Sequence, residues 1–302
     1  MKISYFAAVL AATVSLTSCK KEITEEKKTV ITENKPAEPE VFKEYYGIYT
    51  GDFSGKSNIY DQESKQYYES VDFKKLALKI NRITKDSVYG TSIVDGNQRP
   101  FRGVFNEADK TFVLDEPGNN KYDGRFSVKL NKDSITGTWT AFDKKAVQAP
   151  VKNMKLVKKQ FVYNPNLMLD PAIELVDWEN PKDVPGKYTD PETGKTETYT
   201  ESQNRFASSA VAKINASKQK LTEKDLKNLR KLDLEILKNT IYARHGYAFK
   251  NGTFRTIFEQ SDWYVPVSDN VEADLTPLEK ENIALLSRMA QYAQDKYETF
   301  GR

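Results

Sequence analysis

Residues 43–163 carry the alternation of apolar and polar positions that is typical of β-strands, whose successive side chains point to opposite faces. The pattern is clearest over residues 45–53 and 76–81. Shorter runs of the same kind follow at residues 88–94, 101–105, 111–114, 125–130, 135–142 and 154–157. Turn residues such as Asp95-Gly96 separate most of these runs. The pattern therefore predicts about eight antiparallel strands.

Two architectures fit strands that recur about every 10–12 residues, a sandwich or a closed barrel. Tight turns between consecutive strands favour an up-and-down barrel, which leaves no strand edge unpaired. The segments Gly47-Ile48-Tyr49-Thr50-Gly51 and Gly137-Thr138-Trp139 resemble strands of small lipocalin-like barrels. A barrel of this size is either packed solid with side chains or holds one small ligand. The sequence pattern does not distinguish a packed interior from one that holds a ligand.

Residues 201–302 change to the period of α-helices. Leu234, Leu237, Ile241 and His245 are spaced by three, four and four residues, which places them on one helical face. Gly246 follows where a left-handed cap would end that helix. Further helices are predicted from Thr222 onward, around residues 254–258, and from Thr276-Pro277 onward.

Residues 164–200 lie between these two regions and show little periodicity. Five prolines in or near this segment prevent long helices: Pro165, Pro171, Pro181, Pro185 and Pro191. The sequence thus predicts an α+β protein with two domains, a β-barrel at 43–163 and a small helical domain at 201–302, joined by a Pro-rich connector.

The N-terminus has the order of a bacterial export signal. Lys2 is followed by a mostly apolar run from Tyr5 to Ser15, which is too short to span a membrane as a helix. Leu16-Thr17-Ser18-Cys19 then resembles the lipobox of bacterial lipoproteins. The resemblance implies that residues 1–18 are a signal peptide and that Cys19 carries acyl chains such as palmitate. The alternative is an ordinary signal peptide with a chance cysteine, but Cys19 is the only one in the chain.

Residues 19–42 are charged and Thr-rich, and they are expected to form a disordered tether. An Asp after the lipidated Cys would resemble a signal for inner-membrane retention, but Lys20 stands there. The segment Lys20-Lys21-Glu22 also resembles surface-export signals of some lipoproteins. We therefore expect an outer-membrane lipoprotein that faces the periplasm or the cell surface.

The helical region contains Tyr242-Ala243-Arg244-His245-Gly246, the motif that names the YARHG domain. Trp263-Tyr264-Val265-Pro266 and the segment at 275–283 also resemble that family, over roughly residues 218–290. One departure is Lys238, where many members carry Arg, so a role that needs a guanidinium is in doubt there. The resemblance implies an extracytoplasmic location and a small helical domain, and it implies no particular reaction.

Four residues of this region are candidates for binding a partner: Arg244, His245, Trp263 and Tyr264. Each also has a structural interpretation. His245 would bond to nearby groups on the apolar helical face, Arg244 would hold the helix to a loop, and the two aromatic residues would fill the core.

The composition argues against several classes of function. With one His and one predicted lipidated Cys, a zinc site of the usual Cys/His type is excluded. The 46 basic and 43 acidic residues give a formal net charge of +3, an excess too small to indicate nucleic-acid binding. No nucleophile elbow or phosphate loop occurs, so no catalytic residue, metal or cofactor is predicted. Acidic pairs such as Glu174 and Asp177 leave a carboxylate mechanism open.

These observations lead to a hypothesis of function. We expect a non-enzymatic binding or interaction module, anchored to the membrane through Cys19, whose partner is an envelope glycan, peptide or protein. The alternatives are an envelope hydrolase with paired carboxylates in the connector or the barrel mouth, and a small-ligand carrier that uses the barrel interior.

Overall fold

The computed structural model describes residues 38–62 and 64–300. The predicted signal peptide, Cys19 and most of the predicted tether lie outside these residues. At the end of the tether, the Val41 N–H donates to the Ile83 carbonyl at 2.9 Å, and Phe42 packs against the barrel core. No helix in the described part of the chain is long and apolar enough to cross a membrane.

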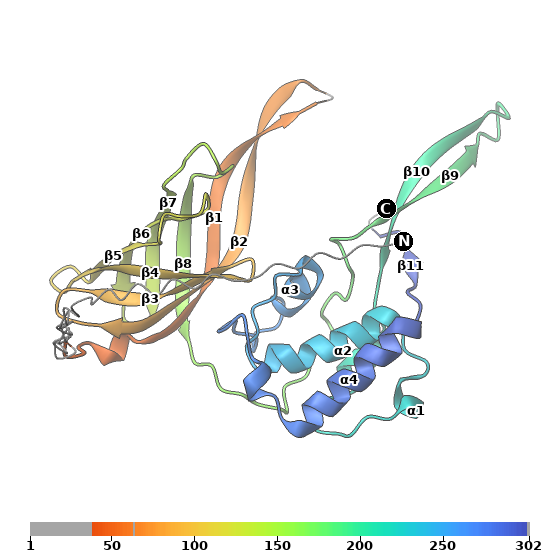
Figure 1. The fold of residues 1–302 in the computed structure, drawn as a ribbon. Coiled ribbons are helices and arrows are strands. Elements are labelled where there is room, and N and C mark those ends of the chain that lie inside the picture. Colours follow the sequence, from red (N-terminus) through yellow and green to blue (C-terminus); the bar gives the residue numbers. More distant parts are fainter. Residues whose placement is uncertain (1–37, 63, 301–302) are drawn as a thin grey trace, which may run out of the picture. The chain divides into compact units, whose positions relative to one another are not determined.

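The N-terminal region is a closed barrel of eight antiparallel strands in up-and-down order (Figure 1). A short 3-10 helix at Lys43–Tyr45 precedes it. The strands are β1 (Gly47–Asp61), β2 (Gln66–Ile83), β3 (Val88–Val94), β4 (Asn97–Asn106), β5 (Thr111–Asp115), β6 (Gly124–Asn131), β7 (Ser134–Ala141) and β8 (Val151–Lys159). Strand β8 pairs with β1 and closes the barrel. The predicted barrel is confirmed, and each predicted run overlaps one strand, although β1 and β2 extend well beyond their predicted runs.

Alternating side chains fill most of the barrel interior. Every second residue of β6 is buried, beginning with Gly124 and Phe126. Tyr49, Phe112 and Leu114 are fully buried in the same cluster, and each such side chain stabilises the fold by roughly 1.5–3 kcal/mol. The interior is therefore packed over much of its length, and a cavity remains at one end.

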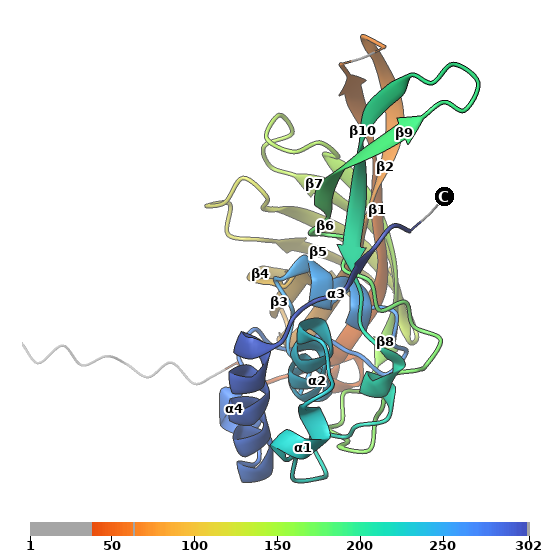
Figure 2. The ribbon, with the colours of Figure 1, turned by 90° about the vertical axis from the view of Figure 1, so that its right-hand side faces the viewer.

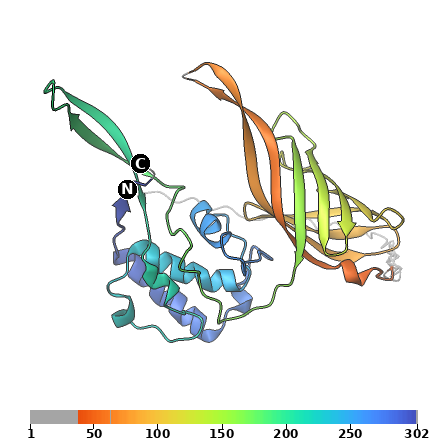
Figure 3. The ribbon, with the colours of Figure 1, turned by 180° about the vertical axis from the view of Figure 1, so that it is seen from behind.

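Strands β1 and β2 continue as a hairpin beyond the other strands of the barrel (Figures 1 and 3). The pairing runs from Gly47 opposite Ile80 to Asp61 opposite Gln66. The sequence pattern predicted only the barrel ends of these two strands, because many of the less exposed positions of the hairpin, such as Ser57, Ser70 and Asp72, are polar and give no apolar repeat in the sequence.

The C-terminal region is helical, as predicted. The α-helices are α1 (Glu223–Leu226), α2 (Lys231–Arg244), α3 (Gly252–Phe258) and α4 (Pro277–Tyr292), with 3-10 turns at Ser209–Ala212 and Glu272–Asp274. Capping boxes at Thr222 and Thr276 begin α1 and α4. Helices α2 and α4 lie side by side (Figures 1 and 2) and bury Leu237, Ile241 and Leu286 in one core.

A small sheet that the sequence pattern did not predict lies in the connector and the first residues beyond it. Strands β9 (Lys182–Thr189) and β10 (Thr196–Arg205) form a hairpin that extends from the helices (Figure 3), and β11 (Tyr297–Glu298) pairs with the end of β10. Pro185 lies within β9, which pairs with β10 alone and is therefore an edge strand, where proline is tolerated.

Candidate functional site

The histidine of the YARHG motif lies in a buried polar cluster. His245 caps the C-terminus of α2 and is 5 % exposed. Its Nε2 lies 2.9 Å from Oε2 of Glu279, and its ring stacks on Tyr163 with 4.2 Å between ring centroids. The Tyr163 hydroxyl donates to the other Glu279 oxygen at 3.1 Å. His245 therefore joins α2 to the first turn of α4.

Glu279 is the centre of this cluster. It is fully buried, and Oε2 also accepts the Thr276 N–H at 2.9 Å as part of the capping box. Burial alone would raise the pKa of Glu279. Hydrogen bonds to its carboxylate from His245, Ser217 and Thr276 outweigh that effect and lower the pKa to about 2. Its carboxylate is thus an ionised acceptor at neutral pH.

Arg244 also forms hydrogen bonds that stabilise the fold. Its side chain is buried, with Nε donating to the Leu167 carbonyl at 2.7 Å and Nη1 donating to the Ser217 hydroxyl at 3.0 Å. Nη2 lies 3.6 Å from the sulfur of Met168. Burial lowers the pKa of Arg244 to about 10, so the group remains charged at neutral pH. Arg244 fixes the segment at 167–168 to α2.

The two aromatic candidates also donate hydrogen bonds to backbone carbonyls. The Trp263 indole N–H donates to the Met168 carbonyl at 2.9 Å, and the Tyr264 hydroxyl donates to the Tyr247 carbonyl at 2.7 Å. The side-chain polar groups of all four candidates therefore bond within the chain, and Arg244 and Trp263 hold the same segment. A partner-binding role for these residues stays a prediction.

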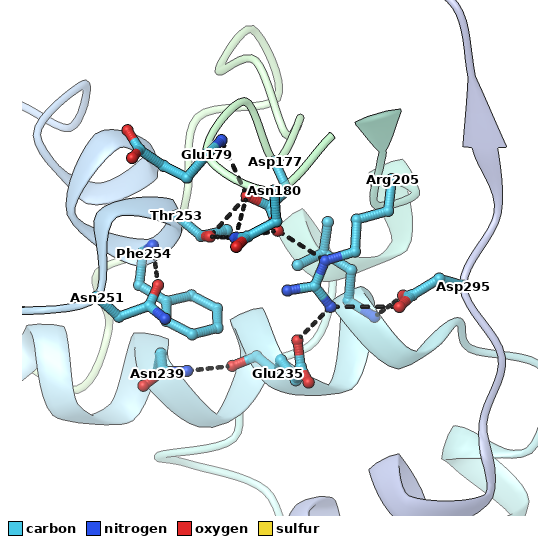
Figure 4. A network of polar contacts seen from close by, with 11 residues as sticks. Asp177, Glu179, Asn180, Arg205, Glu235, Asn239, Asn251, Thr253, Phe254 and Asp295 are labelled. Carbon is cyan, nitrogen blue, oxygen red and sulfur yellow. Dashed lines mark hydrogen bonds and ion pairs between the residues drawn. The ribbon is translucent and has the colours of Figure 1, made fainter. Parts of the chain in front are cut away.

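A second polar network surrounds Arg205 at the end of β10 (Figure 4). Its guanidinium bonds three carboxylates, with distances of 2.7 Å to Asp177, 2.8 Å to Glu235 and 3.3 Å to Asp295. Asp177 is fully buried and also accepts the hydroxyl of Thr253 at 2.6 Å. The three acidic residues come from the connector, from α2 and from the segment after α4, so the network ties these segments together.

The carboxylate pair considered from the sequence does not form here. Burial raises the pKa of Asp177, but hydrogen bonds from Thr253, Arg205 and Asn180 outweigh it and hold that pKa below its usual value. Glu174 instead accepts the Trp178 indole N–H at 3.4 Å. Glu174 and Asp177 have separate partners and lack the matched acid and base that such a mechanism needs.

The mouth of the barrel contains a cavity of about 660 Å³. The cavity lies at the end of the barrel that carries the β1–β2 hairpin and the loops β3–β4, β5–β6 and β7–β8. Phe53, Phe126 and Trp139 contribute aromatic surface to its lining. Charged groups from several strands and loops lie among them: Asp72, Lys74, Asp95, Arg99, Glu116 and Lys152.

Glu116 is held rigidly in this mouth. It is 5 % exposed and accepts hydrogen bonds from the Ser92 hydroxyl at 2.6 Å, the Gly124 N–H at 2.9 Å and the Trp139 indole at 3.2 Å. Burial raises the pKa of Glu116 above its usual value despite these bonds. The bond from its indole N–H to Glu116 holds Trp139 in the wall of the cavity.

The basic groups of the mouth differ in how they are paired. Lys152 bonds Asp72 and lies 4.9 Å from the centroid of the Phe53 ring. Lys74 pairs with Asp95 at 3.0 Å. Arg99 has an ion pair through Nε alone, 3.2 Å from Asp123. The sequence could not predict this arrangement, because its members lie far apart along the chain and meet only when the barrel closes.

Comparison with known proteins bears on the helical region. Residues 209–291 match the model of the YARHG domain, where the sequence predicted such a domain at roughly 218–290. The comparisons with curated proteins and with solved structures found no match. The chain thus contains a YARHG domain that follows a closed eight-stranded β-barrel.

Proposed function

We propose that this protein is exported to the cell envelope, is anchored there through a lipid on Cys19, and acts without catalysis by binding a small ligand in the mouth of its barrel. The YARHG domain supports the extracytoplasmic location, since the family occurs in exported bacterial proteins. The lipobox-like segment before Cys19 supports the anchor.

The cavity at the barrel mouth carries the proposal. Its volume of about 660 Å³ is within the range of small-molecule sites, about 300–1,000 Å³. Such sites combine apolar walls with a few fixed polar groups. The mouth has that combination, with Phe126 and Trp139 beside Arg99 and Glu116. A cavity in the barrel is the feature that distinguishes a ligand carrier from the other functions considered.

A neutral fluorescent probe tests this proposal directly. Phenylnaphthylamine is apolar, and its fluorescence rises when it leaves water for an apolar site. We expect saturable binding to the protein. Ala146→Trp should weaken that binding, because Ala146 lines the cavity and the larger side chain would occupy it.

Ala108→Trp is the matched control. Ala108 is exposed in the β4–β5 turn, at the opposite end of the barrel, and its replacement should leave probe binding unchanged. Equal binding by the wild type and the Ala146→Trp variant would contradict the proposed site. No saturable binding to the wild type would contradict ligand binding in the barrel.

A second candidate function is docking of another envelope molecule on the β1–β2 hairpin. Tyr67, Val71 and Phe73 share one face of β2 and are 73 %, 62 % and 53 % exposed. Tyr60 pairs with Tyr67 on the same face. A row of exposed apolar side chains is typical of a contact surface. Replacing Tyr67 and Phe73 with Ser should reduce retention on isolated envelopes while leaving probe binding in the barrel unchanged.

A further inference from the structure

We infer that the ligand of the barrel mouth is a small organic anion, an apolar ring or chain with one carboxylate or sulfonate group, and that Arg99 binds this group. The inference rests on the proposed function, because it assigns the ligand class of the same cavity. It follows from the way in which the charges of the mouth are paired.

Arg99 has donors that nothing in the described chain satisfies. Its side chain is 17 % exposed, and its one ion pair joins Nε to Oδ1 of Asp123 at 3.2 Å. Among the described residues, neither terminal amino group of Arg99 has a hydrogen-bond partner. Neither terminal nitrogen is among the buried unsatisfied atoms of the described chain, so both are accessible, and an anion could accept two charge-assisted hydrogen bonds from them.

Asp123 contacts Arg99 through one oxygen only, because its other oxygen has partners of its own. Its Oδ2 accepts the backbone N–H groups of Gly118 at 3.0 Å and Asn120 at 3.1 Å. The Arg99 contact to Oδ1 is an ion pair without a well-directed hydrogen bond, since Oδ1 has no hydrogen-bond partner. Asp123 thus also orders the β5–β6 loop, and its contact with Arg99 does not occupy the terminal amino groups of that side chain.

The other charged groups of the cavity already have partners. Lys152 is paired with Asp72, and Lys74 is paired with Asp95. Both oxygens of Glu116 already accept hydrogen bonds from groups of the chain, namely Ser92, Gly124 and Trp139. Arg99 is therefore the cation of the mouth whose two terminal amino groups have no partner among the described residues, and such a pair of N–H groups favours an anionic group that can accept both.

The walls define the remainder of the ligand. Phe53, Phe126 and Trp139 present apolar surface, and Val94 and Val147 are partly buried against the same core. An aromatic or aliphatic body would be buried against these side chains while its anionic group meets Arg99. The planar fork of a guanidinium matches a carboxylate or sulfonate in geometry as well as in charge.

Two related probes separate charge from apolar contact. Anilinonaphthalene sulfonate has the ring system of phenylnaphthylamine with one added sulfonate. We expect Arg99→Gln to raise the Kd of the sulfonate probe about tenfold or more, since charge-assisted hydrogen bonds are lost. The Kd of the neutral probe should not change. Arg99→Lys should restore part of the affinity for the sulfonate probe.

Arg125→Gln is the matched control, because Arg125 lies on β6 and is an exposed cation paired with Asp115 outside the cavity. It should leave both Kd values unchanged. If both probes bind the wild type and Arg99→Gln affects neither, the inference of an anionic ligand is wrong, but the proposed binding site in the cavity is not contradicted. If Arg99→Gln and Arg99→Lys weaken both probes equally, Arg99 is structural and the inference fails. If the wild type binds neither probe, the proposed function fails as well.

Discussion

His245→Ala tests whether the histidine of the YARHG motif acts in the fold. The substitution removes the ring that bonds Glu279 at 2.9 Å and stacks on Tyr163. It leaves a buried carboxylate with fewer donors at the junction of α2 and α4. We expect the helical region to lose stability while its secondary structure remains.

The expected loss can be worked out from these contacts. A hydrogen bond to a charged group contributes about 1.5–3 kcal/mol. The removed ring is 5 % exposed, so a cavity adds to that cost. Tyr163 and Thr276 still donate to Glu279, which limits the loss of stability. The total should be roughly 2–4 kcal/mol.

Unfolding followed by far-ultraviolet circular dichroism measures this loss in the soluble chain that begins after Cys19. The four α-helices of the described chain lie between residues 223 and 292, so the helical signal reports on this region. Glu279→Gln and the double variant complete a mutant cycle with His245→Ala. The two single effects should be non-additive by about 1 kcal/mol or more, because the side chains are in contact.

His245→Gln is the control, since it keeps an N–H donor and should cost less than His245→Ala. An unfolding curve for His245→Ala that overlays the wild type would refute the structural role. Lost binding to envelope components in the same variant would then identify His245 and Arg244 as a partner site.

The remaining predictions concern charge and anchoring. Arg205→Met should destabilise the helical region by about 3–5 kcal/mol in urea unfolding, because it leaves the buried Asp177 without its cation; a loss below about 1 kcal/mol would contradict this. The pKa of Glu279 is lowered from 4.5 to about 2, so its stabilising effect is complete above pH 4.5 and is lost as the pH falls toward 2. Melting temperatures should fall over that window in the wild type, and the fall should be smaller in Glu279→Gln. Cys19→Ala should move the protein out of the detergent phase in phase partitioning, whereas unchanged partitioning would contradict lipidation.

The sequence by itself determined the kind and order of most elements. Alternation with period two predicted β3 to β8 to within a few residues, since one face of each strand is buried. Helical spacing and the capping residues Thr222 and Thr276 predicted α1, α2 and α4 in the same way. These features are local, because a buried face or a cap is encoded by neighbouring residues.

Tertiary structure decided the rest. The β1–β2 extension and the β9–β10 hairpin are formed mainly by pairing between strands, and their exposed faces impose no hydrophobic pattern. The spacing placed His245 on the buried face of α2, but its partner Glu279 became known only from the packing of α4. Arg99 and Glu116 likewise meet at one cavity because the barrel closes. Contacts between residues distant in the chain depend on how the elements pack, and no local pattern encodes that packing.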